Sequence, residues 1–472
     1  MKHSIYNIFL VGFLSFLSSC NPTKQVAGLE KQSLPANYRG SESSDSISVG
    51  NISRDAFFKD PFLTRLIDSA LLKNTNALLA EKNVASAQWM LSAARLGNLP
   101  TLSLQGTAST NRFSDNSLNG ISASSFFNQH HTEDYNLQAM LSWEADIWGK
   151  IHQRKQSALA SYLQQVEVKK TVQTLVVANV TKAYINLLVL DKQLEIARKN
   201  LAIRSRTENI LQLQYESGQV TSLAVKQAKA LKLEAAQLLP QLEEQLTIQE
   251  NALSHLTGKF PDTIYRDSSL THILSKEQTL KSGVPALLLQ NRPDVMAAEL
   301  NVRKAIADQK VARADLYPSL KINAAGGFDA LDFDNWFNTP GSLFGSLMGS
   351  LTAPLINGKK LKAAYNMAKI EREKSLIQFK ETLLSSVNEV SDALVQLQKI
   401  DERLNYIKER ETTLKQAVGE ADMLFKQGMA NYLEVISAQS NLLQSELDKT
   451  NTEKALWNSK IELYRALGGG WK

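Results

Sequence analysis

Cysteine is almost absent from this sequence, because Cys20 is the only one among 472 residues. A lone cysteine cannot form an internal disulfide, which excludes a disulfide-stabilised scaffold. No run of residues after position 20 is long and apolar enough to predict a membrane-spanning helix. Glycine (22 residues) and proline (11 residues) are not enriched, which excludes a low-complexity chain. We therefore expect ordinary packing of helices and strands, over a length sufficient for several domains.

Motifs of the common enzyme classes are also missing. No GxxxxGKS, GxxxxGKT, HExxH or GxSxG pattern occurs, so we expect neither enzymatic activity nor a bound cofactor. Of only six histidines, His130 and His131 are adjacent in a predicted polar loop; they could touch a metal, but solvation is the expected state. The net charge is +6, yet basic residues alternate with acidic ones, which is typical of solvated helix faces and predicts no nucleic-acid binding.

The N-terminus has the pattern of a processed secretory signal. Lys2 precedes an apolar run over residues 8–17 that is too short to span a membrane as a mature helix. The run ends in Leu-Ser-Ser-Cys, which resembles a bacterial lipobox, where the cysteine is cleaved to become an acylated N-terminus. The resemblance implies that residues 1–19 are a lipoprotein signal peptide. The alternative is a cysteine that merely falls within an ordinary secretory signal.

The segment that follows the signal is expected to tether the protein to a membrane. The resemblance puts a covalent lipid, such as palmitate, on Cys20, and each buried methylene contributes about 0.8 kcal/mol to anchoring. Asn21 stands where aspartate is associated with inner-membrane retention, which favours the outer membrane. Residues 20–55 are rich in Ser, Asn and Gly and are predicted to form an extended tether.

A short stretch with a central glycine occurs twice, and the rest of the chain is organised around it. The first copy is YESGQVTSL over residues 215–223, and the second is FKQGMANYL over residues 425–433, 210 residues later. Gly218 and Gly428 interrupt long heptad-patterned sequence, and glycine ends a helix at low cost. Each copy is therefore predicted to be the tip of an antiparallel helical hairpin.

Long helices are predicted on both sides of the first tip. Residues 150–218 would span about 100 Å as one helix, and their apolar seam steps by four and three as in a coiled coil. A shorter helix over 222–258 returns from the tip, and another runs from a cap at Asp60-Pro61 to about Leu96. Helices of this length are expected in a tube and are not needed in a globular domain. The seam residues are Ala183, Leu187, Leu190, Leu194, Ala197 and Leu201.

Strands are predicted where the apolar period changes to two. The clearest covers residues 135–145, after a strand that begins near Leu102 and a polar loop over 110–133. Alternation over about ten residues fits a strand with one face on lipid and one on water, and fits a half-buried strand in a soluble sheet equally well. Two more strands, beginning near Leu320 and Leu343, bring the total to four per chain. Four strands cannot close a membrane barrel, so either the strands belong to a soluble sheet or several chains pool them.

The second half of the chain repeats the first. Pro100 and Pro318 end corresponding helices, and a second long helix follows residues 358–360. The predicted fold is mixed α/β and mainly α, with two tandem repeats that each contain two strands, one long helix and two short helices. The predicted domains are a first repeat over 56–265, a linker over 266–285 and a second repeat over 286–472.

Four further stretches carry a family resemblance. Together with Cys20 they resemble the outer-membrane efflux family of TolC and OprM, in its lipoprotein, NodT-like branch, over essentially all of the mature chain. The stretches are FFKDP at 57–61, SWEADIWGK at 142–150, NRPDV at 291–295 with Glu299, and LYRALGGGW at 463–471.

The resemblance implies a passive duct. It implies a homotrimer with a twelve-stranded β-barrel in the outer membrane and a twelve-helix α-barrel in the periplasm. Substrates, as in multidrug efflux, would come from an inner-membrane pump, of RND type, through a periplasmic adaptor protein. The same architecture serves as the outer-membrane exit of type I protein secretion, which stays open as an alternative. A purely structural coiled-coil lipoprotein is a third hypothesis, which the alternating strands disfavour.

Both tips are expected to contact the adaptor, because the resemblance puts them at the periplasmic end. The alternative is that the two glycines only end their helices. Bulky substitutions at Gly218 or Leu223 are predicted to abolish transport and to leave a membrane-inserted trimer. The predicted contact residues are Gly218, Thr221, Ser222, Leu223, Gly428, Asn431 and Leu433.

A closed pore needs constricted helix ends, and rings of acidic side chains are a common selectivity device. Related channels often carry an aspartate two residues after the second tip glycine, where this chain has Ala430. Asp422 and Glu434 are near enough along the helices to replace it as gate residues. The alternative for each is a solvated helix carboxylate.

Overall fold

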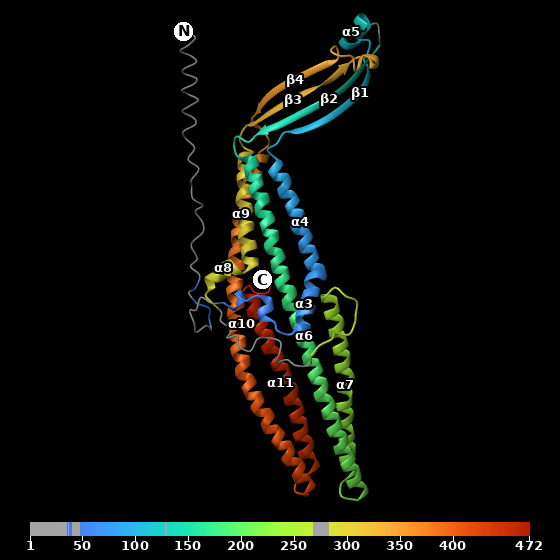
Figure 1. Ribbon diagram of the computed structural model, residues 1–472, viewed down its shortest axis with the longest axis vertical. Helices are drawn as coiled ribbons and strands as arrows, with labels where there is room; N and C mark the ends of the chain where they lie inside the picture. The colour runs from blue at the N-terminus through green and yellow to red at the C-terminus, as the bar shows by residue number, and fades with distance from the viewer. Residues whose placement is uncertain (1–34, 36, 40–47, 128–129, 268–282) are drawn as a thin grey trace. The chain divides into compact units, whose positions relative to one another are not determined.

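Helices dominate the chain, and its strands come in two consecutive pairs (Figure 1). The computed structural model describes residues 35, 37–39, 48–127, 130–267 and 283–472. All elements named below belong to one unit, residues 37–472. The predicted signal peptide, Cys20 and most of the predicted tether and linker lie outside the described residues.

The first repeat opens with α3 (Pro61–Lys73) and α4 (Thr75–Leu96). Asp60 caps α3 as predicted, because its carboxylate accepts a hydrogen bond from the Phe62 amide at 2.7 Å. The prediction of one continuous helix to Leu96 is wrong, since Asn74 separates the two. Its side-chain oxygen accepts from the Asn76 amide and its Nδ2 donates to the Leu256 carbonyl at 2.9 Å. Asparagine favours such caps because its side chain competes for backbone groups.

The predicted hairpins are present in both repeats. The first joins α6 (Lys150–Glu216) to α7 (Ser222–Leu256), and the second joins α10 (Lys360–Lys426) to α11 (Tyr432–Ala466). The long helices have 67 residues each and the returning helices 35 each, as a duplicated unit requires. The other described helical elements are η1 (Val49–Asn51), α2 (Arg54–Phe57), α5 (Leu118–Phe127), η3 (Pro285–Leu287), α8 (Leu288–Asn291), α9 (Pro293–Ala314) and η4 (Phe333–Asn335).

Helix packing joins the two repeats in the middle of this unit. α6 packs on α4, α7, α9 and α11, and α10 packs on α9 and α11. The largest buried cluster draws side chains from the first and second repeats alike, including Leu63, Tyr184, Val390 and Tyr464. Neither repeat could bury these side chains alone, because each supplies only part of the cluster.

One described helix, α6, is apolar enough by composition to cross a membrane, contrary to our expectation for residues after position 20. Its most apolar window of 18 residues has a mean hydropathy of 1.3, and 61% of that window is buried inside the chain. Val176, Val180 and Leu187 of this helix belong to the large buried cluster. Packing against the other helices accounts for the apolar composition of α6.

The four strands form one antiparallel sheet in the order β1-β2-β3-β4. They are β1 (Thr101–Arg112), β2 (His131–Ala145), β3 (Ser319–Ala330) and β4 (Leu343–Thr352). Because opposite residues share a face, the register joins the predicted apolar sets of the four strands into one surface. Leu102 lies opposite Leu141, Leu141 opposite Ala324 and Ala324 opposite Leu347.

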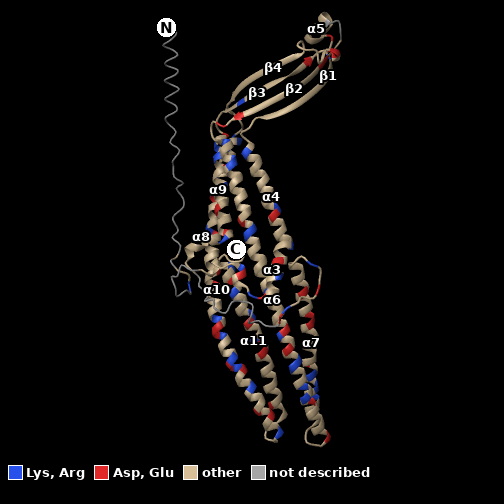
Figure 2. Ribbon diagram, viewed as in Figure 1, with Lys and Arg blue, Asp and Glu red and all other residues tan. Residues whose placement is uncertain are grey.

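This apolar sheet face carries no charged residue from the Ala108–Tyr135 pair to the Leu320–Leu351 pair. Over the same span, the opposite face carries the charged and most of the polar side chains of the sheet, together with Met140, Phe344 and Met348. On this face Ser142 donates a hydrogen bond to Asn323 at 2.8 Å. Figure 2 shows that Lys, Arg, Asp and Glu are distributed along the helices and sparse on the strands. Among the described residues, β1 and β4 each pair with a strand on one side only.

Two predictions about irregular segments need correction. The polar loop predicted over 110–133 contains α5, a helix without charged residues, and the flanking strands extend into it. The predicted tether is ordered at its end, since η1 and α2 lie within residues 48–57 and Val49 is buried. A side chain at Gly50 would clash with the Leu467 carbonyl, so this segment packs closely on the C-terminus. This segment is ordered by contacts with residues hundreds of positions away, which no local sequence pattern could predict.

Candidate functional site

Both hairpin tips use glycine in the left-handed backbone region. The φ angle is 74° at Gly218 and at Gly428. The residue after each glycine donates its amide to a carbonyl in the last turn of the long helix, Gln219 to Gln214 at 2.8 Å and Met429 to Leu424 at 2.9 Å. This pattern satisfies carbonyls that a helix end leaves free. The predicted helix reversals are therefore confirmed at both positions.

The two tips differ in how the returning helix begins. Asn431 caps α11, because its side-chain oxygen accepts hydrogen bonds from the Leu433 and Glu434 amides at 2.9 and 3.1 Å. Thr221 stands at the same position before α7 and makes no side-chain cap bond. A missing cap costs about 1 kcal/mol, so the start of α7 is the less stable of the two.

The predicted adaptor-contact residues all lie at these tips. Leu223 and Leu433, at equivalent positions of the two hairpins, leave 58% and 49% of their area exposed. Thr221 and Ser222 are exposed beside Leu223. The surface is therefore free for a partner in this chain, and adaptor contact stays a prediction.

The predicted gate acids occupy different helices. Asp422, near the end of α10, is paired with Lys426 at 2.8 Å. Glu434 is exposed in the first turn of α11, where its carboxylate accepts a 3.4 Å bond from Asn431. The ion pair offsets the charge of Asp422, so Glu434 is the freer carboxylate. A gating role for either residue stays a prediction.

A contact between the two tips was missed at the level of sequence. A small apolar cluster at the tips takes Leu211, Ala224 and Ala228 from the first hairpin and Phe425 and Tyr432 from the second. The Tyr432 hydroxyl also donates to the Gln227 side chain at 2.6 Å. Small and aromatic residues at helical spacing were a usable signal, but they do not say which hairpin they touch.

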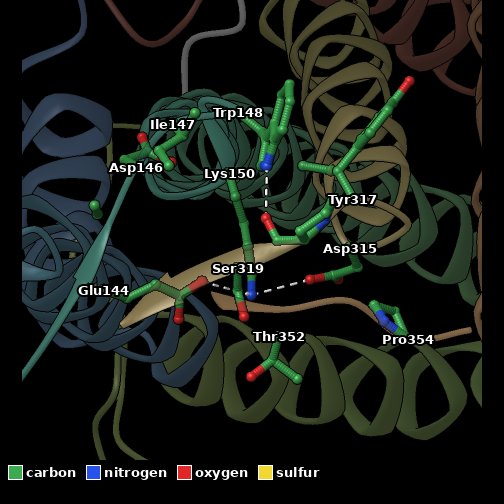
Figure 3. Close-up of a pocket in the computed structure, with 13 residues that line it drawn as sticks. Glu144, Asp146, Ile147, Trp148, Lys150, Asp315, Tyr317, Ser319, Thr352 and Pro354 are labelled. Carbon is green, nitrogen blue, oxygen red and sulfur yellow. Dashed lines mark hydrogen bonds and ion pairs between the residues drawn. The ribbon is translucent and has the colours of Figure 1, made fainter. Parts of the chain in front are cut away.

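The junction between strands and helices holds a cavity of about 230 Å3 with both polar and apolar lining residues, shown in Figure 3. Lys150, at the start of α6, bridges Glu144 of β2 at 3.2 Å and Asp315, just after α9, at 3.0 Å. Trp148 donates its indole N–H to the Pro318 carbonyl at 2.7 Å. These contacts tie the end of β2 and the start of α6 to the turn between α9 and β3.

The two tryptophans of the SWEADIWGK stretch make their contacts where helices meet strands. Trp143 donates its indole N–H to the Asn98 carbonyl at 2.9 Å, and Trp148 stacks on Tyr317 at 4.9 Å. Both partners belong to the turns that connect helices to strands. The structure therefore assigns both side chains to the junction.

The remaining stretches behind the family resemblance converge in the core. Tyr464 stacks on Phe57 with ring centroids 3.9 Å apart, and burial raises the pKa of Tyr464 to about 12. A side chain at Gly468 would clash with the Asn291 carbonyl, which brings the NRPDV stretch to the same place. These residues pack segments from the start, middle and end of the described chain against one another, so their role is to stabilise the fold.

Arg292 is the buried charge of this core, with 4% of its area exposed. It pairs with Asp294 at 2.6 Å and Glu389 at 2.9 Å and donates to the Ala466 carbonyl. Burial opposes the charge of Arg292, but the two carboxylates outweigh it and raise its pKa. Burial also opposes the charge of Asp294 and by itself would raise its pKa. The hydrogen bonds and the positive charge of Arg292 have the larger combined effect, so the pKa of Asp294 lies below its usual value.

Metal ligands do not gather in the part of the chain that the structure describes, since no group of three or more His, Cys, Asp or Glu side chains is close enough to hold an ion. His130 lies 3.3 Å from Asp115 and His131 lies 3.8 Å from Glu133, each as an exposed pair. The arrangement does not provide the ligand number that a protein metal site uses.

Comparison with known proteins gives matches over nearly the whole length. The model of the family "Outer membrane efflux protein" matches residues 66–259 and 284–469. The solvent efflux pump outer membrane protein SrpC of Pseudomonas putida is 29% identical over 435 residues, which cover 92% of this chain and 91% of SrpC. The probable outer membrane lipoprotein SilC of Salmonella typhimurium is 26% identical, with 88% and 87% covered.

Solved structures share the fold. The outer membrane protein VceC of Vibrio cholerae superposes with a TM-score of 0.79 at 24% identity, covering 88% of this chain and 98% of VceC. The open state of the MtrE outer membrane channel of Neisseria gonorrhoeae gives 0.82 at 24% identity, with 92% and 95% covered. The described sheet and hairpins thus have the architecture found in outer-membrane channels.

Proposed function

The chain belongs to the outer membrane efflux protein family, and from that premise we propose that it is the exit duct of a tripartite efflux system. The duct passively conducts small molecules delivered by an inner-membrane pump, of RND type, through a periplasmic adaptor. The observation that carries the proposal is the sheet, which has one continuous uncharged apolar face and a second face that carries its charged and most of its polar side chains. A strand in a water-filled membrane barrel needs such a pair of faces.

The working unit that we propose is a homotrimer. A sheet edge cannot stay unpaired in lipid, because an unsatisfied backbone group costs several kcal/mol there. β1 and β4 are such edges in the described chain, and pairing β4 of one chain with β1 of the next removes them all. Three chains give twelve strands in the outer membrane and twelve helices in the periplasm.

Transport needs no chemistry from this protein under the proposal. The sequence has no nucleotide-binding motif, so the pump supplies the energy. The exposed leucines at the tips, with Gly218, Thr221, Ser222, Gly428 and Asn431 beside them, are proposed to meet the adaptor. An apolar side chain in a pocket of the partner, within a polar rim, is the usual anchor of such an interface.

Two measurements on the purified full chain test the proposal. The native mass in detergent is expected to equal three chains, and reconstitution into a planar bilayer is expected to give discrete single-channel conductance. A stable monomer without conductance would overturn both the trimer and the duct. A trimer without conductance in any state would leave the assembly standing and overturn the pore.

The exit channel of type I protein secretion is the second candidate, because a wide duct of this architecture selects little by itself. Deletion of the gene distinguishes the two. We expect increased sensitivity to small toxic compounds and an unchanged set of secreted proteins. Loss of one secreted protein with unchanged sensitivity would favour the secretion exit instead.

A further inference from the structure

Exposed cations gather where the helices approach the sheet, and we call this set the basic rim. Figure 2 shows Lys and Arg at the ends of α4 and α9 that lie nearest to the strands. None of the rim side chains forms an ion pair or a side-chain hydrogen bond within the described residues. The rim consists of Arg95 in α4, Lys310 and Arg313 in α9, and Lys359 and Lys362 at the start of α10.

The carboxylates nearest to the basic rim are bonded to other partners. Asp315 pairs with Lys150 at 3.0 Å, and Asp308 pairs with Lys304 at 2.9 Å. Asp146 accepts two backbone amides of the first turn of α6, both at 2.8 Å. The last two turns of α4 and the first two turns of α10 contain no acidic residue. The positive charge of the rim is therefore not balanced within the described chain, and like charges repel one another.

The side of the helices on which α9 carries its rim residues can be read from two surface pockets. Arg154 of α6 lines one pocket with Ser142, whose side chain is on the polar face of the sheet. It lines a second pocket with Asp308 of α9. Residues two positions apart on a helix point about 200° apart. Lys310 follows Asp308 by two positions, and Arg313 likewise follows another residue of that pocket. Both cations therefore lie on the side that continues the apolar sheet face.

The internal repeat extends this assignment to α4 and α10. A shift of 218 residues carries α4 onto α9, so Arg95 holds the position of Arg313. A shift of 210 residues carries α6 onto α10, so Lys362 holds the position of His152. His152 precedes Arg154 by two positions and thus lies on the opposite side of α6 from the pockets. The rim therefore recurs in both repeats, on the same side of the helices.

A second copy of the chain does not neutralise the rim. α9 packs on α6 and α10, whereas α4, its counterpart, packs on α6. The repeat therefore predicts that α4 also packs on α10 of the next chain in the proposed trimer. This contact brings Arg95 toward Lys359 and Lys362, and these helix ends supply no carboxylate. Assembly thus concentrates the positive charge into a continuous belt.

The segment before α10 changes from apolar to basic within a few residues. Leu355 and Ile356 leave 91% and 97% of their area exposed, and Lys359 follows them. Lys359 adopts φ 63°, in the left-handed region that Gly149 occupies before α6. A lysine there carries backbone strain that glycine would avoid, and such strain usually persists for a functional reason. Apolar side chains followed by cations are typical of the boundary between membrane hydrocarbon and headgroups.

We infer that the basic rim binds the headgroups of anionic phospholipids in the periplasmic leaflet of the outer membrane. The inference rests on the proposed function, in which the sheet spans this membrane and the helices extend into the periplasm. Lipid tails then cover the apolar sheet face, and the headgroups of the same lipids reach the level of the rim. Each Lys or Arg near an anionic lipid surface adds to the attraction, and salt weakens it. The rim thereby sets the depth at which the barrel sits.

Matched charge-removing variants of the full-length chain test the inference. The control removes the same charge from exposed cations of the first hairpin that have no ion pair in the described chain. Each protein is purified in a nonionic detergent and mixed with equal amounts of phosphatidylglycerol and phosphatidylcholine that carry the same acyl chains. The lipid that stays bound after gel filtration is quantified by mass spectrometry. The rim variant combines Lys310→Gln, Arg313→Gln and Lys362→Gln, and the control combines Arg206→Gln, Lys226→Gln and Lys229→Gln.

The wild type and the control are expected to retain phosphatidylglycerol over phosphatidylcholine about tenfold, and the rim variant within about twofold. The preference of the wild type should disappear near 1 M salt, where the screening length is about 3 Å. This salt series tests the inference without any substitution. Phosphatidylglycerol should also raise the thermal midpoint of the wild type, whereas inorganic phosphate at the same concentration should not.

The outcomes separate the inference from the proposed function. A trimeric, conducting wild type without lipid preference would overturn the inference and leave the duct standing. Equal loss of preference in the control would assign the effect to net charge and would also overturn the rim. Equal stabilisation by inorganic phosphate would identify a small-anion site in place of a lipid surface. A monomeric native mass for the unmodified protein would overturn the proposed function itself.

Discussion

Single residues decide the shape of each tip, and Gly218 is the clearest case. It adopts φ 74°, and a Cβ added there would meet nothing within 4 Å. The cost of a side chain is therefore backbone strain alone, about 1–2 kcal/mol for Ala and more for the β-branched Val. Asparagine tolerates the left-handed region better. We expect Gly218→Val to lower export strongly, Gly218→Ala partly and Gly218→Asn least, with the trimer intact by native mass. Equal export by all three would show that the tip geometry is unimportant.

Asp294 sets a pH dependence at the residue scale. Because its pKa is lowered in the folded chain, its stabilisation is present above the unfolded pKa and is lost as pH falls through the folded pKa. Asp294→Asn leaves Arg292 short of one buried partner, and we expect a loss of about 2 kcal/mol, discounted for the partial exposure of Asp294.

The stability difference between wild type and Asp294→Asn should be constant from neutral to weakly acidic pH and shrink below about pH 4. Denaturant midpoints across this range measure it. Glu299→Gln is the matched control, because Glu299 forms an exposed ion pair with Arg303 and should change stability by no more than about 0.5 kcal/mol. A difference that grew in acid would contradict the assigned direction of the pKa shift.

Helices begin and end where side chains form hydrogen bonds with free backbone groups, and Asn74 lies at the ends of three helices. It ends α3, caps α4 and donates to the last turn of α7. Asn74→Ala removes the cap and leaves the Leu256 carbonyl without its donor, for an expected loss of about 2 kcal/mol. Asn74→Asp keeps the cap acceptor and loses only the donor, so we expect a smaller loss. Thermal midpoints of the purified variants measure both, and equal losses would mean that the cap contributes nothing.

Sequence periodicity was sufficient to predict the hairpins and the strands, because the spacing of apolar residues and the position of glycine follow from local backbone geometry. Gly218 and Gly428 marked the turns, and alternation marked residues 135–145 within the observed β2. Periodicity missed the break at Asn74, because apolar spacing continues through it. It also missed the order of residues 48–55, whose partners Tyr464 and Leu467 are about 400 positions away. The gating role of Asp422 or Glu434 stays a prediction, since the residues that would face them in a pore belong, under the proposal, to other chains.

At the scale of the whole molecule, the sheet and the proposed lipid on Cys20 are two independent anchors. More than one acyl chain gives stable anchoring, at about 0.8 kcal/mol per buried methylene, and a closed barrel separately satisfies every backbone group within the membrane. The barrel should therefore hold the protein in place without the lipid. We replace residues 1–20 with a cleavable secretory signal that lacks the cysteine, so that the mature chain carries no lipid. The variant is expected to reach the outer membrane as a trimer and to export within about twofold of the wild type. Membrane fractionation and native mass measure this, and release of the unlipidated chain into the soluble periplasm would show that the strands do not form a spanning barrel.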